Sequence, residues 1–220
     1  MSALLPQDCL LCGTPGGAAA LCTGCADSLP LLPAPRCPVC ALPTPGGGTC
    51  GACLKSPPAF DASNAVWRYA FPVDKLVQSL KFEHHLALAQ LFAAAMLAGP
   101  RPSGDLLVPL PLSPLRLRER GFNQAVEIAR PLARALGIPL NSDGCRRARE
   151  TAAQTSLPWK ERRRNVKNAF ECRVDLTGQS IIVVDDVMTT GATLDEFART
   201  LKRHGAASVT NWIPARALRD

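Results

Sequence analysis

The sequence predicts an α/β domain with a mostly parallel, three-layer sheet, preceded by a small cysteine-rich module. From residue 58 onward, short apolar runs alternate with segments of helical periodicity, which is typical of parallel sheets covered by helices. Before residue 58, eight cysteines lie among many glycine, proline and alanine residues, so this segment has little core of its own. We therefore expect two domains, residues 1–57 and residues 58–220.

The composition is that of a globular protein. Hydrophobic residues make up 47% of the 220 residues and charged residues 20%, which excludes a disordered chain. The longest apolar stretch, residues 86–98, is interrupted by Gln90 and is too short to span a bilayer. The first residues show no cationic segment followed by an apolar run, so no secretory signal is visible. We expect a cytoplasmic protein without membrane insertion.

The cysteines of the first module form four C-x2-C pairs, separated by nine, eleven and nine residues. A two-residue spacing lets both thiolates of a tight knuckle face one ion, and two knuckles complete a tetrahedral shell of four sulfurs. Eight ligands therefore predict two Zn²⁺ ions, in preference to redox motifs or disulfides. The predicted ligands are Cys9, Cys12, Cys22, Cys25, Cys37, Cys40, Cys50 and Cys53.

The equal nine-residue gaps favour sequential pairing of the C-x2-C pairs, first with second and third with fourth, although an interleaved arrangement also fits. Because each site is closed by four protein ligands, no position is left for a catalytic water, and both zinc ions are predicted to be structural. The two remaining cysteines, Cys145 and Cys172, are expected to be ordinary thiols.

The second domain begins after two consecutive prolines. Residues 64–71 predict a short strand, and helical patterns follow over residues 73–82 and 86–97. The segment DLLVPLPL (105–112) predicts a buried strand that ends at prolines. Residues 123–137 predict a helix that ends at a glycine.

The same alternation continues to the end of the chain. QSIIVVDD (179–186) predicts a second buried strand, residues 191–206 the helix after it, and residues 208–214 a last strand. Ligands of such sheets bind at the carboxyl ends of the strands, where each strand turns into a helix.

Two adjacent carboxylates, Asp185 and Asp186, stand at the end of one of these strands, and a small, hydroxyl-rich turn follows at residues 189–193. Small residues and a glycine let backbone N–H groups close around an anion at a helix N-terminus. The turn therefore predicts a phosphate cup. The lysine of a nucleoside-triphosphate loop and the glycine pattern of a dinucleotide fingerprint are both absent.

Carboxylates beside a phosphate cup would repel the phosphate, so they are expected to face another part of the same ligand. A ribose 5-phosphate fits, because two vicinal hydroxyls can donate hydrogen bonds to two carboxylates while the phosphate fills the cup. A role as a helix cap would explain one carboxylate and not the second.

The strand and its TTGAT turn resemble the signature of type I phosphoribosyltransferases, and the whole chain is similar to the competence-associated ComF family. Further matches are the four cysteine pairs, VPLPLSPLRLRERGFNQA (108–125) and RARETAAQTSLPWKERRRNVKNAF (147–170). The resemblance implies a type I phosphoribosyltransferase fold with an N-terminal double zinc ribbon. It also implies binding of 5-phosphoribosyl-1-diphosphate (PRPP) together with Mg²⁺.

The resemblance also implies roles for individual residues. The two aspartates would bind the ribose hydroxyls, residues 189–193 the 5-phosphate, and the turn after Pro109 would approach the diphosphate. The implied PRPP-binding residues are Asp185, Asp186, Thr189, Thr190, Gly191, Ala192, Thr193, Pro109, Leu110, Arg118 and Arg120. The candidate catalytic residues are Asp185, Asp186 and Arg162.

The charge distribution supports a diphosphate ligand. Residues 146–167 contain eight basic and two acidic residues, in a chain of formal net charge +7. Arginine forks match phosphate oxygens in pairs, and residues 151–164 are expected to form a mobile hood over the substrate. A second basic cluster comprises Arg116, Arg118 and Arg120. The same arginines would also suit a nucleic acid backbone.

Two functions remain open at this point. The resemblance implies a role in DNA uptake during natural transformation, with single-stranded DNA and the uptake machinery as partners. The alternative is a phosphoribosyltransferase that acts on an unidentified small-molecule or base acceptor, unrelated to DNA. Phe122, Trp159 and Trp212 are the candidates for stacking on bases. No residue identifies the acceptor or the oligomeric state.

Overall fold

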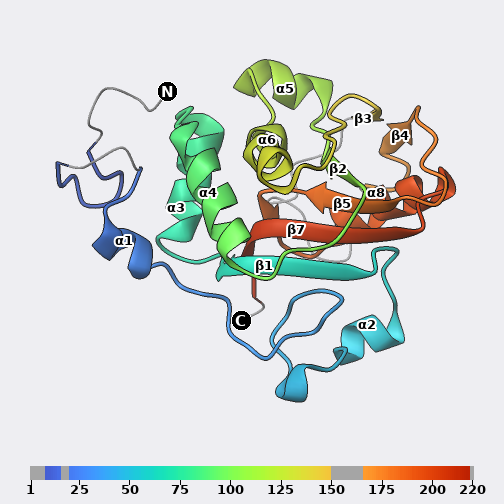
Figure 1. The fold of residues 1–220 in the computed structure, drawn as a ribbon, viewed down its shortest axis with the longest axis horizontal. Coiled ribbons are helices and arrows are strands. Elements are labelled where there is room, and N and C mark those ends of the chain that lie inside the picture. The colour runs from blue at the N-terminus through green and yellow to red at the C-terminus, as the bar shows by residue number, and fades with distance from the viewer. Residues whose placement is uncertain (1–7, 16–19, 150–165, 219–220) are drawn as a thin grey trace.

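The computed structural model describes residues 8–15, 20–149 and 166–218. Its centre is a parallel sheet in which β1 (Ala62–Arg68), β7 (Ser208–Arg216), β5 (Ser180–Val184) and β2 (Leu106–Pro109) lie in that order, and β6 (Val187–Met188) also pairs with β7. Every pairing in this sheet is parallel, as the alternation of strands and helices predicts. In Figure 1, β5, β7 and β1 lie one below another, with α5 and α6 above them in the view.

Both faces of the sheet are covered, which explains why its strands are apolar at successive positions. On β5, Ile182 and Val184 face the core formed with α3 (Val73–Phe82), α4 (Ala87–Ala98) and α6 (Gln124–Leu136). The residues between them, Ile181 and Val183, belong to the core on the opposite face. α8 (Ala192–Arg203) covers that face, so helix, sheet and helix form three layers.

The helices agree closely with the sequence analysis, whereas strand ends differ. The helix expected over residues 73–82 is α3. β1 begins and ends a few residues earlier than expected, because the chain leaves the sheet after Arg68 to enter α3. β2 ends at Pro109, since residues 110–112 already belong to the loop that leads to α5 (Pro114–Arg120).

α5 is a short helix that the sequence analysis did not assign. Ser113 caps its first turn by accepting a hydrogen bond from the backbone N–H of Arg116 (3.5 Å), and Gly121 ends it with φ +73°. The side-chain oxygen of Asn123 caps α6 by accepting a hydrogen bond from the backbone N–H of Ala125 (3.0 Å). Its side-chain NH₂ group donates to the carbonyl of Leu110 (3.0 Å). The segment after β2 is therefore fixed to the start of α6.

The strands β3 (Cys145–Arg147) and β4 (Phe170–Cys172) form an antiparallel pair. Their register sets Cys145 opposite Cys172, and the two cysteines form a disulfide. The expectation of two ordinary thiols was therefore wrong. The pair was missed because two strands of three residues, separated by 27 positions in the sequence, carry no periodicity that reveals their register.

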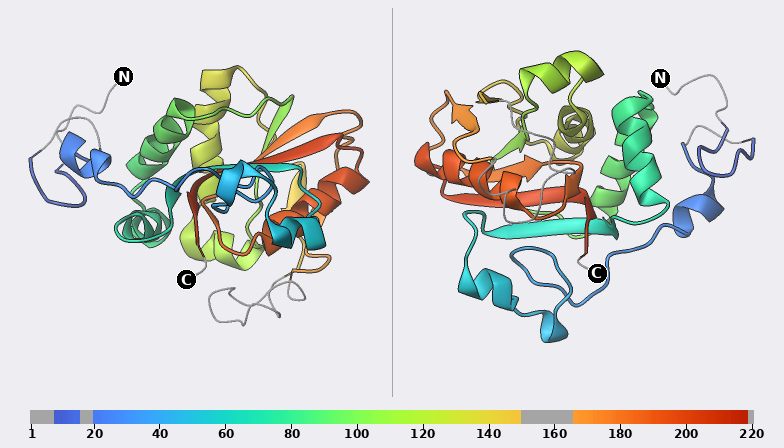
Figure 2. Two further views of the ribbon diagram at one scale, coloured as in Figure 1. Left: turned by 90° about the horizontal axis from the view of Figure 1, so that it is seen from below. Right: turned by 180° about the vertical axis from the view of Figure 1, so that it is seen from behind.

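The cysteine-rich segments wrap around the second domain at two places. The first segment, with α1 (Thr23–Asp27), lies beside α3, and the second, with η1 (Pro45–Gly47) and α2 (Gly51–Lys55), lies beneath β1 (Figure 1 and Figure 2). The second segment is hydrogen-bonded to β1, for example from the guanidinium of Arg36 to the carbonyl of Ala65 (2.7 Å). Among the described residues, no helix is long and apolar enough to cross a membrane.

Candidate functional site

The eight cysteines of the N-terminal segments form two clusters, Cys9–Cys12–Cys22–Cys25 and Cys37–Cys40–Cys50–Cys53. Within each cluster the sulfurs all lie within 4.8 Å of one another. The Sγ atoms of Cys12 and Cys22 are 3.7 Å apart, and those of Cys40 and Cys50 are 3.6 Å apart. A tetrahedral zinc ion with Zn–S bonds of about 2.3 Å places its sulfurs about 3.8 Å apart, so both clusters fit zinc. The sequential pairing is confirmed.

The protonation of the first cluster also favours a cation. Backbone N–H groups, chiefly those of Cys22 and Cys12, lower the pKa of the Cys9 thiol to about 6. The neighbouring sulfurs of Cys12 and Cys22 raise the pKa of Cys25 to about 12. Four thiols at this spacing cannot all ionise unless a positive charge lies between them, and Zn²⁺ supplies that charge.

A separate cavity of about 620 Å³ lies at the carboxyl ends of β2 and β5. Its walls come from the segment after β1, the second half of α3, the loop after β2, α5, the start of α6, β3 and the segment from the end of β5 to the start of α8. The lining residues are Tyr69, Gln78, Lys81, Phe82, His84, Leu110, Pro111, Leu112, Arg116, Glu119, Arg120, Asn123, Gln124, Arg147, Asp185, Asp186, Val187, Thr189 and Thr193. This is the position at which parallel α/β sheets bind ligands.

The two carboxylates in this cavity are not equivalent. Asp186 is buried, and its Oδ2 atom lies 2.7 Å from Nζ of Lys81. Asp185 is half-buried, and its Oδ1 atom accepts a hydrogen bond from the backbone N–H of Asp186 (2.8 Å). Burial, followed by the charge of Asp186, raises the pKa of Asp185 to about 8, although Lys81 acts in the opposite direction. The pair therefore holds a proton near neutral pH.

Lys81 lines this cavity beside Asp186, and the sequence analysis missed it. It lies in the last turn of α3, more than a hundred positions before the aspartates, in a stretch whose pattern indicates only an amphipathic helix. No spacing rule connects it to Asp186, because the fold alone brings the two together.

Arginines form the positive side of the cavity. Arg116 and Arg120 extend from α5, and Arg147 from β3. The guanidinium of Arg120 lies over the ring of Phe82, 5.1 Å from its centroid. Burial lowers the pKa of Arg120, and the charge of Asp186 partly offsets this effect. Opposite charges thus meet across the cavity.

The expected phosphate cup is a turn between β6 and α8. Gly191 has φ +79°, which lets the chain reverse before the first helical residue, Ala192. The hydroxyl oxygen of Thr190 accepts a hydrogen bond from the backbone N–H of Ala192 (3.1 Å). Thr189 and Thr193 line the 620 Å³ cavity. Thr190, Gly191 and Ala192 border a second cavity of about 440 Å³, on the side of Cys40 and Cys53.

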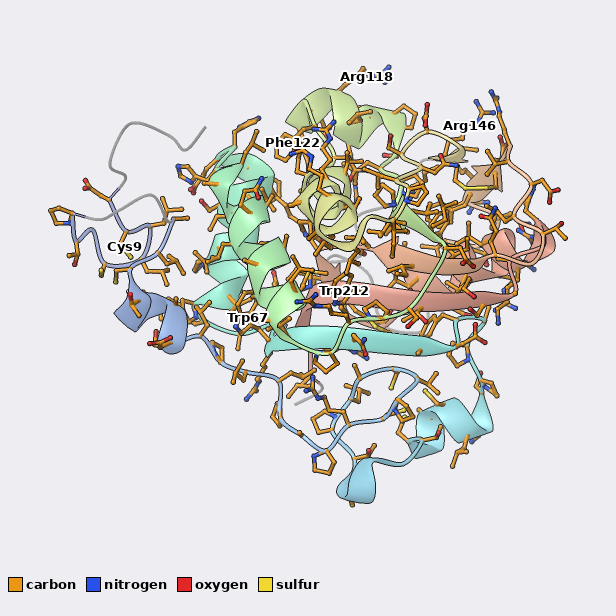
Figure 3. The ribbon with its side chains drawn as sticks, viewed as in Figure 1. Cys9, Trp67, Arg118, Phe122, Arg146 and Trp212 are labelled. Carbon is orange, nitrogen blue, oxygen red and sulfur yellow. A yellow bond between two sulfur atoms is a disulfide. The ribbon has the colours of Figure 1, made fainter. Side chains whose placement is uncertain are left out.

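The structure brings most of the expected PRPP-binding residues to one place. Leu110, Arg120 and the two aspartates line the same cavity as Thr189 and Thr193. Pro109 is buried at the end of β2. Arg118 lies exposed on the outer side of α5, apart from the residues that line the cavity (Figure 3). Arg162 and the whole of the expected hood, residues 151–164, lie outside the described residues.

The candidates for base stacking require a correction. Trp212 is only 1% exposed and packs between the sheet and the helices, because β7 is a central strand, so it is not available to a base (Figure 3). Phe122 is half-buried beside the ring of His84, with 5.5 Å between centroids. Trp159 lies outside the described residues. Phe82, which the sequence analysis did not consider, lines the cavity and is 63% exposed.

Comparison with known proteins places these features in a family. A model described as a double zinc ribbon domain matches residues 1–54, and one described as a phosphoribosyl transferase domain matches residues 123–215. DNA utilization protein YhgH from Escherichia coli O157:H7 is 36% identical over 97% of this chain and 99% of its own length. Competence protein F from Haemophilus influenzae is 34% identical over 76% of this chain and 78% of its own length. The chain belongs to the ComF family.

A further relative is less similar in sequence. Competence protein ComFC from Bacillus subtilis is 28% identical over 90% of this chain and 84% of its own length. Among solved structures, one similar to this chain is glutamine PRPP amidotransferase from B. subtilis, complexed with ADP and GMP. The matched region covers 57% of this chain and 25% of that chain, at 19% identity and a TM-score of 0.40. At this TM-score we draw no functional conclusion from the similarity. ComF membership confirms the expected zinc ribbon and phosphoribosyltransferase-like domain.

Proposed function

We propose that this protein binds PRPP with Mg²⁺ in the cavity at the ends of β2 and β5, and that it handles single-stranded DNA during DNA uptake. The observation that carries the proposal is the meeting of Asp185 and Asp186 with Thr189 and Thr193 of the turn in one cavity. A cavity of about 620 Å³ suits a ligand of this size. The names of the ComF relatives, DNA utilization protein and competence protein, favour a role in DNA uptake over an acceptor unrelated to DNA.

Each part of PRPP has a matching group in the cavity. The ribose hydroxyls would donate to the carboxylates of Asp185 and Asp186. The 5-phosphate would lie at Thr189 and Thr193, near the N-terminus of α8, where helices favour a negative charge. The diphosphate would face the arginines of α5 and Arg147.

Mg²⁺ fits the same residues, because it binds through one or two carboxylates together with phosphate oxygens. Asp185 and Asp186 are the carboxylates at the strand end that can supply such ligands. When bound, the ion would neutralise charge on the diphosphate. The aspartates would meanwhile orient the sugar, and the surrounding side chains would limit the access of water.

If the protein turns PRPP over, the reaction is a displacement at the ribose C1 atom. The bond from C1 to the diphosphate oxygen breaks with its electron pair, a bond from the acceptor forms at C1, and the acceptor releases a proton. Arg120 and Arg147 would stabilise the charge on the departing diphosphate. No covalent intermediate is needed, because positioning and electrostatics lower the barrier.

Thermal unfolding tests this proposal with fragments of the ligand. PRPP with Mg²⁺ should raise the melting temperature more than ribose 5-phosphate or pyrophosphate at the same concentration, because only PRPP fills both the phosphate turn and the arginine side. A ligand at a hundred times its Kd stabilises the folded state by about 2.7 kcal/mol. If pyrophosphate alone raised the melting temperature as much as PRPP does, the site would be one that binds anions without recognising the ribose.

Turnover and DNA handling need a second measurement. The protein is incubated with PRPP, Mg²⁺ and candidate base acceptors, with and without single-stranded DNA, and pyrophosphate is followed. Release that depends on an acceptor or on DNA supports catalysis. PRPP binding without release in any mixture would make PRPP a regulatory ligand of a DNA-handling protein.

A further inference from the structure

Arg216 joins three segments of the molecule that are distant in sequence. It lies at the end of β7 and is only 2% exposed. Its Nε atom donates to the carbonyl of Cys40 (2.8 Å), and its Nη1 atom donates to the carbonyl of Met188 (2.9 Å). Nη1 also donates to the carbonyls of Thr189 and Ala217. One buried guanidinium therefore contacts a cysteine of the second cluster and the beginning of the phosphate-binding turn.

These hydrogen bonds constrain the turn because a buried charge must keep its partners. Moving the carbonyl of Met188 or Thr189 would leave a guanidinium that is only 2% exposed partly unsatisfied. Met188 acts on the turn by packing as well. It is 1% exposed, and its Cε atom lies 2.7 Å from where a side chain at Gly191 would begin.

The carbonyl of Cys40 is fixed by the knuckle of the second cluster. The backbone N–H of Ala41 donates to the carbonyl of Cys37 (2.9 Å), and the backbone N–H of Cys37 donates to the carbonyl of Leu42 (2.8 Å). The four sulfurs of this cluster fit zinc, which would hold both knuckles together. The knuckle, Arg216 and the turn thus form one continuous chain of contacts, which a bound zinc ion would extend to all four cysteines.

The first cluster has no such connection among the described residues. Cys9 packs in the core formed with α3, α4 and Trp67, on the other face of the sheet. The second cluster shares its core with Met188 and with the residues of α8. The two clusters have similar ligands and therefore provide a test and a control within one chain.

We propose that Arg216 is a positioning residue through which the second zinc site holds the turn at residues 189–193 in its binding shape. The assignment of this turn to a phosphate rests on the function proposed above, whereas the mechanical link does not. Loss of zinc from the second cluster should loosen the turn, and loss from the first should not.

The experiment compares Cys50→Ser with Cys22→Ser in the full-length protein. Each residue is the third ligand of its cluster and is partly buried. Elemental analysis first establishes that each variant has lost one zinc ion. Hydrogen exchange is then measured on the peptide that covers residues 188–195, without any ligand. We expect Cys50→Ser to speed exchange there by about tenfold, and Cys22→Ser to leave it within about twofold of the wild type.

Arg216→Lys tests the link itself. Lysine keeps the charge but has a single nitrogen in place of the guanidinium, whose Nε and Nη1 atoms bond Cys40 and Met188 at the same time. The rate of hydrogen exchange in the same peptide should therefore rise while both zinc ions stay bound. Equal exchange in Cys50→Ser and Cys22→Ser, or an unchanged rate in Arg216→Lys, would overturn the proposal. Because exchange is read without PRPP, a wild-type protein that fails to bind PRPP would refute the proposed function and leave this test intact.

PRPP affinity supplies a second readout. If the wild type binds PRPP, Cys50→Ser and Arg216→Lys should weaken it by about tenfold, and Cys22→Ser should not. If exchange were faster in Cys50→Ser and Arg216→Lys but PRPP affinity were unchanged, the second cluster would hold the turn, and the turn would not bind the phosphate of PRPP.

Discussion

The two adjacent carboxylates at the end of β5 have different surroundings. Partial burial, followed by the charge of Asp186, raises the pKa of Asp185 to about 8, whereas Asp186 is held 2.7 Å from Lys81. The sequence placed both aspartates at a strand end, and their role in binding ribose stays a prediction. It did not indicate which of them carries a proton, because that depends on Lys81 and on burial.

This difference predicts that PRPP binding releases a proton from Asp185. Below pH 8 the free carboxyl is protonated, but an ionised carboxylate is needed to accept hydrogen bonds from the sugar and to bind Mg²⁺. Affinity should therefore rise with pH up to about 8. Calorimetry at pH 7 in two buffers of different ionisation heat gives the number of protons released. Asp185→Asn should release fewer, and an equal number in both proteins would contradict the assignment.

The left-handed backbone conformation of Gly191 predicts that a side chain at this position lowers both stability and PRPP affinity. Gly191→Ala places a side chain at φ +79° and pushes on the buried Met188. Gly178→Ala is the matched control, because it has φ +75° with no atom within 4 Å of the new Cβ. Both variants should lose about 1–2 kcal/mol of unfolding free energy from the backbone conformation. Only Gly191→Ala should also lose PRPP affinity in calorimetry, and equal affinities would show that the turn tolerates a side chain.

Among the elements, α5 carries arginines with different surroundings. Arg120 lines the cavity over Phe82, whereas Arg118 is exposed on the other side of the helix. The basic pattern was visible in the sequence, but the helix was not assigned, so the direction of each arginine was unknown. The expected PRPP role of Arg118 stays a prediction.

The position of these arginines predicts separate effects on the two ligands. Arg120→Ala should reduce PRPP affinity more than Arg118→Ala does, and Arg118→Ala should reduce affinity for single-stranded DNA. Affinity for DNA should fall with salt at a log–log slope of about −0.7 per phosphate contacted, and Arg118→Ala should flatten that slope. Fluorescence anisotropy across a salt series measures it. A slope that no α5 variant changes would exclude this helix from the DNA surface.

The whole chain shows how far sequence patterns reach. The long helices α3, α4, α6 and α8 and the parallel sheet followed from periodicity, and the cysteine spacing favoured the zinc pairing that the structure shows. The Cys145–Cys172 disulfide, Lys81 and Arg216 did not, because each depends on a contact between segments that only the tertiary structure brings together. Local patterns predicted the ligand groups at the strand end, and long-range contacts determine how those groups are held.

The two cysteine clusters predict two zinc ions per chain. Elemental analysis of protein purified without chelator should find two, and Cys37→Ser should remove one, because the second cluster keeps only three thiolates. The variant should also melt at a lower temperature, since the second cluster shares its core with the main domain. One ion or none in the wild type would contradict the assignment.

Calorimetric titration of PRPP with Mg²⁺ into the wild type, Asp185→Ala, Asp186→Ala and Asp143→Asn tests the central claim most directly. Asp143 is exposed in a loop and is absent from the cavity lining, so it controls for the loss of one negative charge. The wild type and Asp143→Asn should bind alike. Each alanine variant should lose a charge-assisted hydrogen bond worth about 1.5–3 kcal/mol, which is about tenfold or more in affinity. Unchanged affinity in both alanine variants would show that these carboxylates do not bind the ribose.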